Sequence, residues 1–352
     1  SAMGGVESVV NLGLSILPAH FILPGIFIIS AIVATAIGTS SGTLAAIAPI
    51  ALAIAQETNS SIPLYFSAVY CGALFGDNLS IISDTTIAAT TGAGCEMRDK
   101  FRMNFLIAIP AAVATVIALA VMGSGTETIS GDLTFNIIKI LPYIYVLVAA
   151  ILGMDVFVVL TSGTFLAGLV GILTGSLTVA GFVQAIGTGM SGMMTTAIVA
   201  ILLRGLIGII SAYGGIDWLV EVLRRKVHTR KGAEYCIGAM SGLLDFSLIN
   251  NTIAIMIAAP LAKDMADEYH IAPKRNASLL DIFACAVHGL APHAGGMLTL
   301  SGFYAALNPL AVVQYNFYCY FLIIAALVTI HFGLLRTPEE KEYARQEKSA
   351  RK

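Results

Sequence analysis

Apolar segments long enough to cross a lipid bilayer follow one another along most of this chain. Phe105–Met122 is an uninterrupted apolar run, and Ile137–Leu152, Val156–Leu173 and Leu310–Phe332 are three more. A transmembrane helix needs about 20 mostly apolar residues. Only 11% of the residues are charged, against about a quarter in a soluble domain. We therefore predict an all-α polytopic membrane protein, and no basic run resembles a nucleic-acid-binding patch.

One stretch concentrates polar side chains inside this apolar sequence. From Gly76 to Thr86 the chain carries two carboxylates, one carboxamide and four hydroxyls. An acidic side chain at membrane depth is expensive and by default marks an ion or substrate pathway. Oxygen ligands of these kinds suit a small hard cation such as Na⁺. The residues predicted to bind the cation and the proton are Asp77, Asn78, Ser80, Ser83, Asp84 and Thr85, with Asp77 and Asp84 as the Na⁺ ligands.

A buried carboxylate gives a simple route to ion exchange. Burial disfavours the charged form of a carboxylate, and a bound cation favours it. An empty site at Asp77 or Asp84 would therefore hold a proton, and Na⁺ would expel it. Competition for one carboxylate is enough for antiport if the site faces the two sides of the membrane in turn. The alternative role of either residue is to cap a helix within a hairpin.

Short polar breaks divide two of the apolar segments. Residues 38–43 separate Phe21–Ala36 from Leu44–Ala55, and residues 250–252 follow Ala233–Leu248. Non-helical backbone at membrane depth is tolerated where it lines a cavity or is buried in protein. We therefore predict two discontinuous helices, and a plain connecting loop is the alternative for the first. The side chains that the first break adds to the predicted cation site are Thr39, Ser40, Ser41 and Thr43.

The second half of the chain repeats the order of the first. Three pairs mark the repeat at almost the same separation, namely Pro49 and Pro260, Asn104 and Asn316, and Gly76 and Gly289. We predict two inverted-topology repeats, each with a broken transmembrane helix, a re-entrant hairpin and a closing helix, which is typical of secondary transporters. The substrate or second-repeat site comprises Asn250, Asn251, Thr252, His288 and His293, where the histidines would relay protons or contact a solute.

This organisation divides the chain into four predicted parts. Residues 1–122 form the first repeat, which begins almost inside apolar sequence as expected if a first helix is missing. Residues 123–232 are connecting helices and a basic loop, 233–335 are the second repeat, and 336–352 are a tail. Cytoplasmic loops are rich in Lys and Arg. The loops carrying Arg98, Lys100 and Arg102 and carrying Arg224–Lys231 should therefore be cytoplasmic, like the tail, and the loop Gly123–Asp132 should be outside.

Four charged residues within apolar sequence have weaker interpretations. Asp155 is an inner-loop residue or a second proton site. Arg204 is a charge partner or extends from a helix end to the membrane surface. Asp245 could reach the ion site or cap the second break, and Asp281 could lie at the mouth of the second hairpin.

The stretch Gly-Asp-Asn-Leu-Ser-Ile-Ile-Ser-Asp-Thr-Thr resembles the NhaC-type sodium/proton antiporter family, within the ion transporter superfamily. The resemblance extends through Gly38–Pro49 and Cys95–Phe105 and implies Na⁺/H⁺ exchange with the Asp-rich hairpin at its centre. It also implies the inner membrane of a prokaryotic cell. Two features depart from the family pattern: Ile81 replaces a common proline, and the second hairpin, His288–Gly296, differs from typical members.

The sequence thus predicts a secondary active transporter, not an enzyme, that exchanges Na⁺ for H⁺ by alternating access. The alternative is a Na⁺- or H⁺-coupled carrier of a small amino acid or carboxylate, which the polar second half favours. The five cysteines are scattered without the spacing of a zinc site, and no cofactor is expected beyond the transported Na⁺. The predicted partners are Na⁺, H⁺ and the lipid bilayer, with a small organic solute and a second copy of the chain in a homodimer as further candidates.

Overall fold

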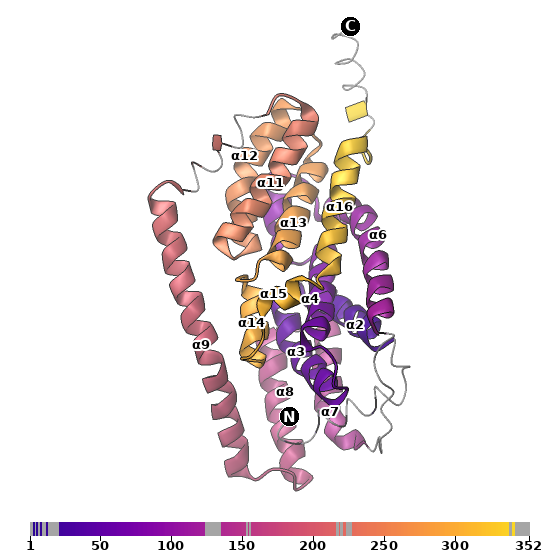
Figure 1. Cartoon of the computed structure of the whole chain (residues 1–352), viewed down its shortest axis with the longest axis vertical. Coiled ribbons are helices and arrows are strands. Elements are labelled where there is room, and N and C mark those ends of the chain that lie inside the picture. The colour runs from indigo at the N-terminus through magenta and orange to yellow at the C-terminus, as the bar shows by residue number, and fades with distance from the viewer. Residues whose placement is uncertain are drawn as a thin grey trace. The chain divides into compact units, whose positions relative to one another are not determined.

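The computed structural model describes residues 21–123, 135–152, 156–215 and 227–337, together with a few isolated positions. Every regular element in these residues is a helix (Figure 1), which confirms the all-α prediction. The helices of the first half are α2 (Ile22–Ile37), α3 (Ser40–Glu57), α4 (Ile62–Leu79), α5 (Asp84–Ala93) and α6 (Met97–Gly123). Those of the middle are α7 (Ile137–Ile151), α8 (Val156–Leu173) and α9 (Val179–Ala212). Those of the second half are α11 (Arg230–Leu248), α12 (Asn251–Glu268), α13 (Pro273–Leu290), α14 (Gly295–Phe303), α15 (Pro309–Val313) and α16 (Phe317–Phe332).

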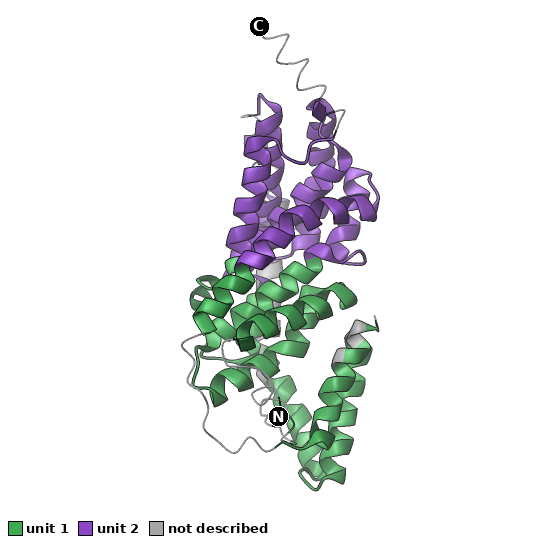
Figure 2. Ribbon diagram, turned by 90° about the vertical axis from the view of Figure 1, so that its right-hand side faces the viewer, with its two compact units in different colours: residues 1–77, 115–201, 295–317 green, residues 78–114, 202–294, 318–352 purple. Residues whose placement is uncertain are grey.

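The chain forms two compact units (Figure 2). Unit 1 comprises residues 1–77, 115–201 and 295–317, and unit 2 comprises residues 78–114, 202–294 and 318–352. Within unit 1, α2 packs on α3 and α7, α7 packs on α8, and α14 packs on α3. Within unit 2, α11, α12 and α13 pack on one another, and α5 packs on α12 and α13. Each unit therefore combines helices from both halves of the chain.

Helix boundaries in the second half recur at one constant offset from those in the first, the offset that separates Pro49 from Pro260. The helices α2 and α11 end at this offset, and α3 and α12, α4 and α13, and α5 and α14 begin at it. The backbone follows the same pattern, because Gly38 and Ile249 both have positive φ angles, of 75° and 59°. This register pairs Asp77 with His288, so the predicted pairing of Gly76 with Gly289 is out of register.

The breaks between the paired helices are shorter than predicted. Only Gly38 and Thr39 separate α2 from α3, because the extended backbone of Thr39 lets the next helix start at once. The predicted break residues Ser40, Ser41 and Thr43 therefore lie inside α3. In the second half, Asn250 caps α12 by accepting the Ile253 amide at 2.8 Å, and Asn251 and Thr252 lie in the first turn of that helix.

The basic segment after α5 is a helix rather than the predicted loop. Met97 begins α6, so Arg98, Lys100 and Arg102 lie in its first turns. Arg98 and Arg102 are exposed, whereas Lys100 is fully buried. Residues four apart share a helix face, which separates the two arginines from Lys100. Charge alone does not distinguish these faces in the sequence.

Large apolar side chains remain exposed on several helices. On α6 they include Leu106, Ile117 and Val121, and α8 exposes Phe157 and Leu173. Two helical segments of the described residues, 97–123 and 273–303, are long and apolar enough to cross a membrane. The loop at 124–132, Asp155, the side chain of Arg204 and nearly all of the tail lie outside what the structure describes, so those predictions remain predictions.

Two glycines allow α4 to approach α2 closely within unit 1. A Cβ atom at Gly72 would overlap the carbonyl oxygen of Phe27, and one at Gly76 would overlap the carbonyl oxygen of Ala31. Small residues four apart are a common solution for close packing of membrane helices. The hydroxyl of Thr35 also donates to the Gly76 carbonyl, at 3.3 Å. The position of the polar end of α4 thus depends on these glycines.

Replacing Gly76 with alanine should destabilise the protein, because the added methyl meets backbone rather than a movable side chain. Overpacking of this kind costs about 1–3 kcal/mol. Thermal unfolding of the detergent-solubilised protein measures the loss. Gly187→Ala is the matched control, since no atom of the described residues lies within 4 Å of a Cβ placed there. Equal unfolding temperatures for the two variants would contradict the packing argument.

Candidate functional site

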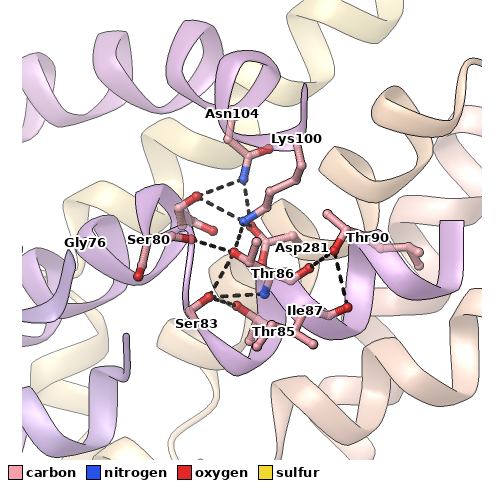
Figure 3. A network of polar contacts seen from close by, with 12 residues as sticks. Gly76, Ser80, Ser83, Thr85, Thr86, Ile87, Thr90, Lys100, Asn104 and Asp281 are labelled. Carbon is pink, nitrogen blue, oxygen red and sulfur yellow. Dashed lines mark hydrogen bonds and ion pairs between the residues drawn. The ribbon is translucent and has the colours of Figure 1, made fainter. Parts of the chain in front are cut away.

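The polar stretch of the sequence forms the break between α4 and α5. Residues 80–83 are non-helical. Ser83 caps α5 by accepting the amide of Thr86 at 3.1 Å, and the Thr86 hydroxyl donates to the Ser80 carbonyl at 2.7 Å. The Ser83 hydroxyl also lies 3.0 Å from that of Thr85. Figure 3 shows these side chains turned toward one another, so the break is an ordered polar structure.

A buried lysine joins this break to the second half of the chain. The Nζ atom of Lys100 donates to the Thr86 hydroxyl at 2.7 Å and to the Asn78 carbonyl at 3.1 Å. It also forms an ion pair with Asp281 Oδ2 at 2.7 Å, with 1% and 0% of the two side chains exposed. An ammonium group has three N–H donors, and three oxygens surround this one. Lysine and aspartate are almost never fully buried unless paired.

Asn104, one helical turn after Lys100, contacts the same two acceptors. Its Nδ2 atom lies 2.7 Å from Asp281 Oδ2 and 3.1 Å from the Asn78 carbonyl. Figure 3 shows Asn104 and Lys100 reaching from α6 toward Asp281, with Thr86 beside them. Residues of α4, α5, α6 and α13 thus meet in one buried network inside unit 2.

Several acceptor atoms of this network have no hydrogen-bond partner among the described residues. They are Oδ1 of Asn78, Oδ1 of Asn104 and Oδ1 of Asp281, and all three are buried. The other end of the Asn78 amide donates to the Tyr318 hydroxyl at 2.9 Å. Buried polar atoms nearly always have a partner, and an unpartnered one needs an explanation. Oxygen acceptors without donors are what a small cation would satisfy.

The two predicted aspartates have different surroundings. Asp77 is buried near the end of α4 and is the last residue of that segment of unit 1. Asp84 is exposed as the first residue of α5, a position where the helix dipole stabilises a carboxylate. It lines a cavity of about 590 Å³ between α5 and α12, together with Thr252 and Lys263. The expectation of burial is therefore met by Asp77 and is wrong for Asp84.

The second polar centre forms a separate contact within unit 2. His288 Nδ1 lies 3.1 Å from Asp245 Oδ1, and both side chains are buried. Asp245 therefore pairs with a histidine, and its side chain does not cap the second break. His293 Nε2 lies 2.8 Å from the Phe246 carbonyl, and its ring packs edge-on against that phenylalanine. Both histidines thus contact α11.

The partners of the break are not evident from the sequence. The basic residues around Lys100 predict a loop there, and Asn104 enters the sequence analysis only as a marker of the internal repeat. Asp281 is expected at the mouth of a hairpin. In the structure it lies fully buried in the middle of α13. The sequence does indicate that Lys100 and Asn104 share one helix face, because they are four residues apart at the polar start of an apolar helix. The pairing with Asp281 has no local signal, since about half of the chain separates it from Lys100.

A second cavity in unit 2, of about 820 Å³, lies next to the loop between α5 and α6. Its lining includes Cys95, Asp99, Lys274 and Thr337. Burial, and to a lesser degree Asp99, raises the pKa of the Cys95 thiol to about 11. The thiol is therefore protonated at neutral pH and a poor nucleophile or metal ligand.

Comparison with known proteins bears on what such a site does. A family model described as the Na⁺/H⁺ antiporter family matches residues 1–124 and 129–336. The Na⁺/H⁺ antiporter NhaC of Alkalihalophilus pseudofirmus is 24% identical over 96% of this chain and 79% of its own length. The arginine/ornithine antiporter ArcD of Halobacterium salinarum is 23% identical over 96% of this chain and 77% of its own. The malate-2H⁺/Na⁺-lactate antiporter of Bacillus subtilis is 33% identical over 35% of this chain and 26% of its own.

Proposed function

Because this chain belongs to the Na⁺/H⁺ antiporter family and is thus a multi-pass membrane transporter, we propose that it exchanges Na⁺ for H⁺ by alternating access. The observation that carries the proposal is the buried network at the helix break, with its carboxylate, hydroxyls, carbonyl groups and unpartnered acceptor oxygens. These are ligands for a small hard cation. Burying such polar groups together inside a membrane protein costs free energy, so their presence indicates a functional site.

In this proposal a buried aspartate is shared by the cation and the proton. Asp77 is the favoured carboxylate of the polar stretch, because Asp84 is exposed and stays hydrated. Burial disfavours the charged carboxylate until a cation binds. Hydroxyl and amide oxygens of the polar stretch supply the remaining ligands, namely Asn78, Ser80, Ser83 and Thr85.

The recurring helix boundaries support the alternating-access part of the proposal. Two repeats of opposite orientation would give the protein two related conformations, each open to one side. The short helix α14 of the second half packs on α3 of the first half, and α5 of the first half packs on α12 of the second. Two related repeats would make this pair of equivalent contacts. We place the protein in the inner membrane of a prokaryotic cell, with the exposed Arg98 and Arg102 and the C-terminal tail on the cytoplasmic side.

Transport measurements with purified protein in liposomes test the exchange. With a pH dye inside, Na⁺ added outside should move protons in the wild type, while K⁺ should not. Asp77→Asn should reduce the Na⁺ response by about tenfold or more, because an amide cannot exchange a proton for a cation. Asp264→Asn is a matched control on an exposed position of α12. A normal Na⁺ response in Asp77→Asn would remove Asp77 from the mechanism.

A cation-coupled solute carrier is the second candidate. The cavity between α5 and α12 favours it, because it is mostly apolar and carries one carboxylate, Asp84, and one ammonium, Lys263. Among the relatives, the names of two include amino-acid or carboxylate substrates. If the wild type stays silent with Na⁺ until an amino acid or carboxylate is supplied, and Asp84→Asn weakens that response, the protein is the solute carrier.

A further inference from the structure

We propose that the ammonium group of Lys100 occupies the cation position of the ion site and that Na⁺ competes with it for Asp281. The inference rests on the proposed exchange and deepens it, because it adds Asp281 to Asp77 as a carboxylate of the site and names a built-in competitor. Three oxygens surround Lys100 Nζ: Asp281 Oδ2, the Thr86 hydroxyl and the Asn78 carbonyl, at 2.7, 2.7 and 3.1 Å. A carboxylate, a hydroxyl and a backbone carbonyl are the kinds of oxygen that bind Na⁺.

Charge makes the two cations alternatives to each other. The buried pair of Lys100 and Asp281 is neutral, and a pair of Na⁺ and Asp281 would be neutral too. Two cations at one carboxylate in a buried site repel each other strongly. Na⁺ can therefore bind fully only when the Lys100 ammonium leaves the carboxylate, and its flexible four-carbon stem must then carry the charge to water or to another acceptor.

The unpartnered acceptors distinguish this network from a salt bridge that only holds helices together. A buried ion pair stabilises a fold when further hydrogen bonds satisfy the remaining lone pairs. Here Oδ1 of Asp281 and Oδ1 of Asn104 are buried without a partner among the described residues. The network thus offers more acceptors than Lys100 uses, which suits a site that must also coordinate a second cation.

The second repeat provides an internal comparison for the role of the charges. Tyr70 precedes Asp281 by the same number of residues that separates Pro49 from Pro260, so Tyr70 is the counterpart of Asp281. Val312 follows Lys100 by the same number of residues that separates Asn104 from Asn316, so Val312 is the counterpart of Lys100. Tyr70, Val312 and Asn316 are fully buried. Asn316 accepts a contact from the Cys71 thiol at 3.8 Å within unit 1. The counterpart positions, of which Val312 lies in the separate short helix α15, thus hold buried neutral side chains in place of Lys100 and Asp281.

Sodium-dependent stability tests the competition without relying on transport. Purified protein is unfolded by heat in NaCl or in choline chloride at equal ionic strength. In choline chloride Lys100→Gln should unfold at a lower temperature than the wild type, because Asp281 loses its counter-charge. NaCl should restore most of the lost unfolding temperature of Lys100→Gln. Because the competing ammonium is gone, the half-maximal rise in unfolding temperature should need a Na⁺ concentration at least about tenfold lower than in the wild type.

The double variant Lys100→Gln/Asp281→Asn is the control, and it should respond to Na⁺ much more weakly than Lys100→Gln. A merely structural lysine predicts a different result: the Lys100→Gln variant stays equally destabilised in both salts. That result, or an equal Na⁺ response in the double variant, would overturn the proposal. Transport gives an independent readout, because Na⁺-driven proton movement by the wild type can succeed or fail whatever the stability data show.

Lys100→Arg keeps the test decisive if Lys100→Gln cannot be purified in either salt. A guanidinium group binds a carboxylate with two parallel hydrogen bonds and is harder to displace than an ammonium. Half of the Na⁺ effect on stability should then require a concentration at least about threefold higher than in the wild type. An unchanged or lower Na⁺ requirement in Lys100→Arg would contradict competition between Lys100 and Na⁺.

Discussion

Asp281→Asn should abolish Na⁺-driven proton movement, with a loss of about 100-fold or more. The substitution leaves the Lys100 ammonium buried without a counter-charge, although its contacts to Thr86 and the Asn78 carbonyl remain. Breaking a buried pair in this way also costs about 3–5 kcal/mol of folding stability. The variant also removes the carboxylate that the network shares between Lys100 and Asn104. Initial rates in liposomes, normalised to the amount of inserted protein, measure the effect.

Loss of folding must be separated from loss of the ion site in this experiment. Lys100→Gln/Asp281→Asn removes both charges and leaves groups that can hydrogen-bond to each other, which is often close to neutral for stability. The double variant should therefore recover much of the thermal stability of the wild type while remaining inactive in exchange. If Asp281→Asn or the double variant exchanges Na⁺ for H⁺ at the wild-type rate, Asp281 is not part of the ion site.

Glu234→Gln should cause a large loss of thermal stability in unit 2, similar in size to that of Asp281→Asn. Glu234 lies between two buried arginines: its Oε2 is 2.9 Å from Arg275 Nη2, and its Oε1 is 3.4 Å from Arg230 Nε. Arg230 keeps a second partner, Glu340, at 2.7 Å, whereas Arg275 keeps a contact to the neutral Thr329 hydroxyl. Leaving the Arg275 charge buried and uncompensated should lower the free energy of unfolding by about 3–5 kcal/mol.

Thermal unfolding in detergent again provides the measurement, and Glu268→Gln provides the control. Glu268 ends α12 in the same unit and is exposed, so the same chemical change there should alter stability by at most about 0.5 kcal/mol. Similar unfolding temperatures for both variants would show that the arginines are compensated in some other way.

Local features of the sequence predict much of this fold. Polar residues between apolar halves place the breaks near Thr39 and Asn250, and the separation of Pro49 from Pro260 equals the constant offset of the helix boundaries. The break after α4 is likewise recognisable from its polar residues. These features are visible because helix caps and apolar runs are properties of neighbouring residues, and a repeat is found by comparing two such local patterns.

The partners of the candidate site cannot be predicted in this way. The positive-inside rule counts basic residues without regard to the helix face on which they lie, so it assigns Lys100 to a cytoplasmic loop. Its pairing with Asp281, and that of Asp245 with His288, joins residues on different helices that are distant in the sequence. Such contacts depend on how helices pack, and no short-range pattern in a single sequence encodes them. The exposure of Asp84 follows in the same way from the position of α5 against α12 and α13.

The exchange of helices between the two halves has a consequence for how this protein is made. A ribosome that has just completed α6 has incorporated Lys100 but not Asp281, which follows Lys100 about half a chain length later. At about 5–20 residues per second this interval lasts roughly 10–35 seconds. During biosynthesis the lysine must therefore remain hydrated, or in contact with a chaperone or the insertion machinery, until α13 emerges. Neither unit can be completed until the final part of the chain has been synthesised, because both contain residues beyond 294.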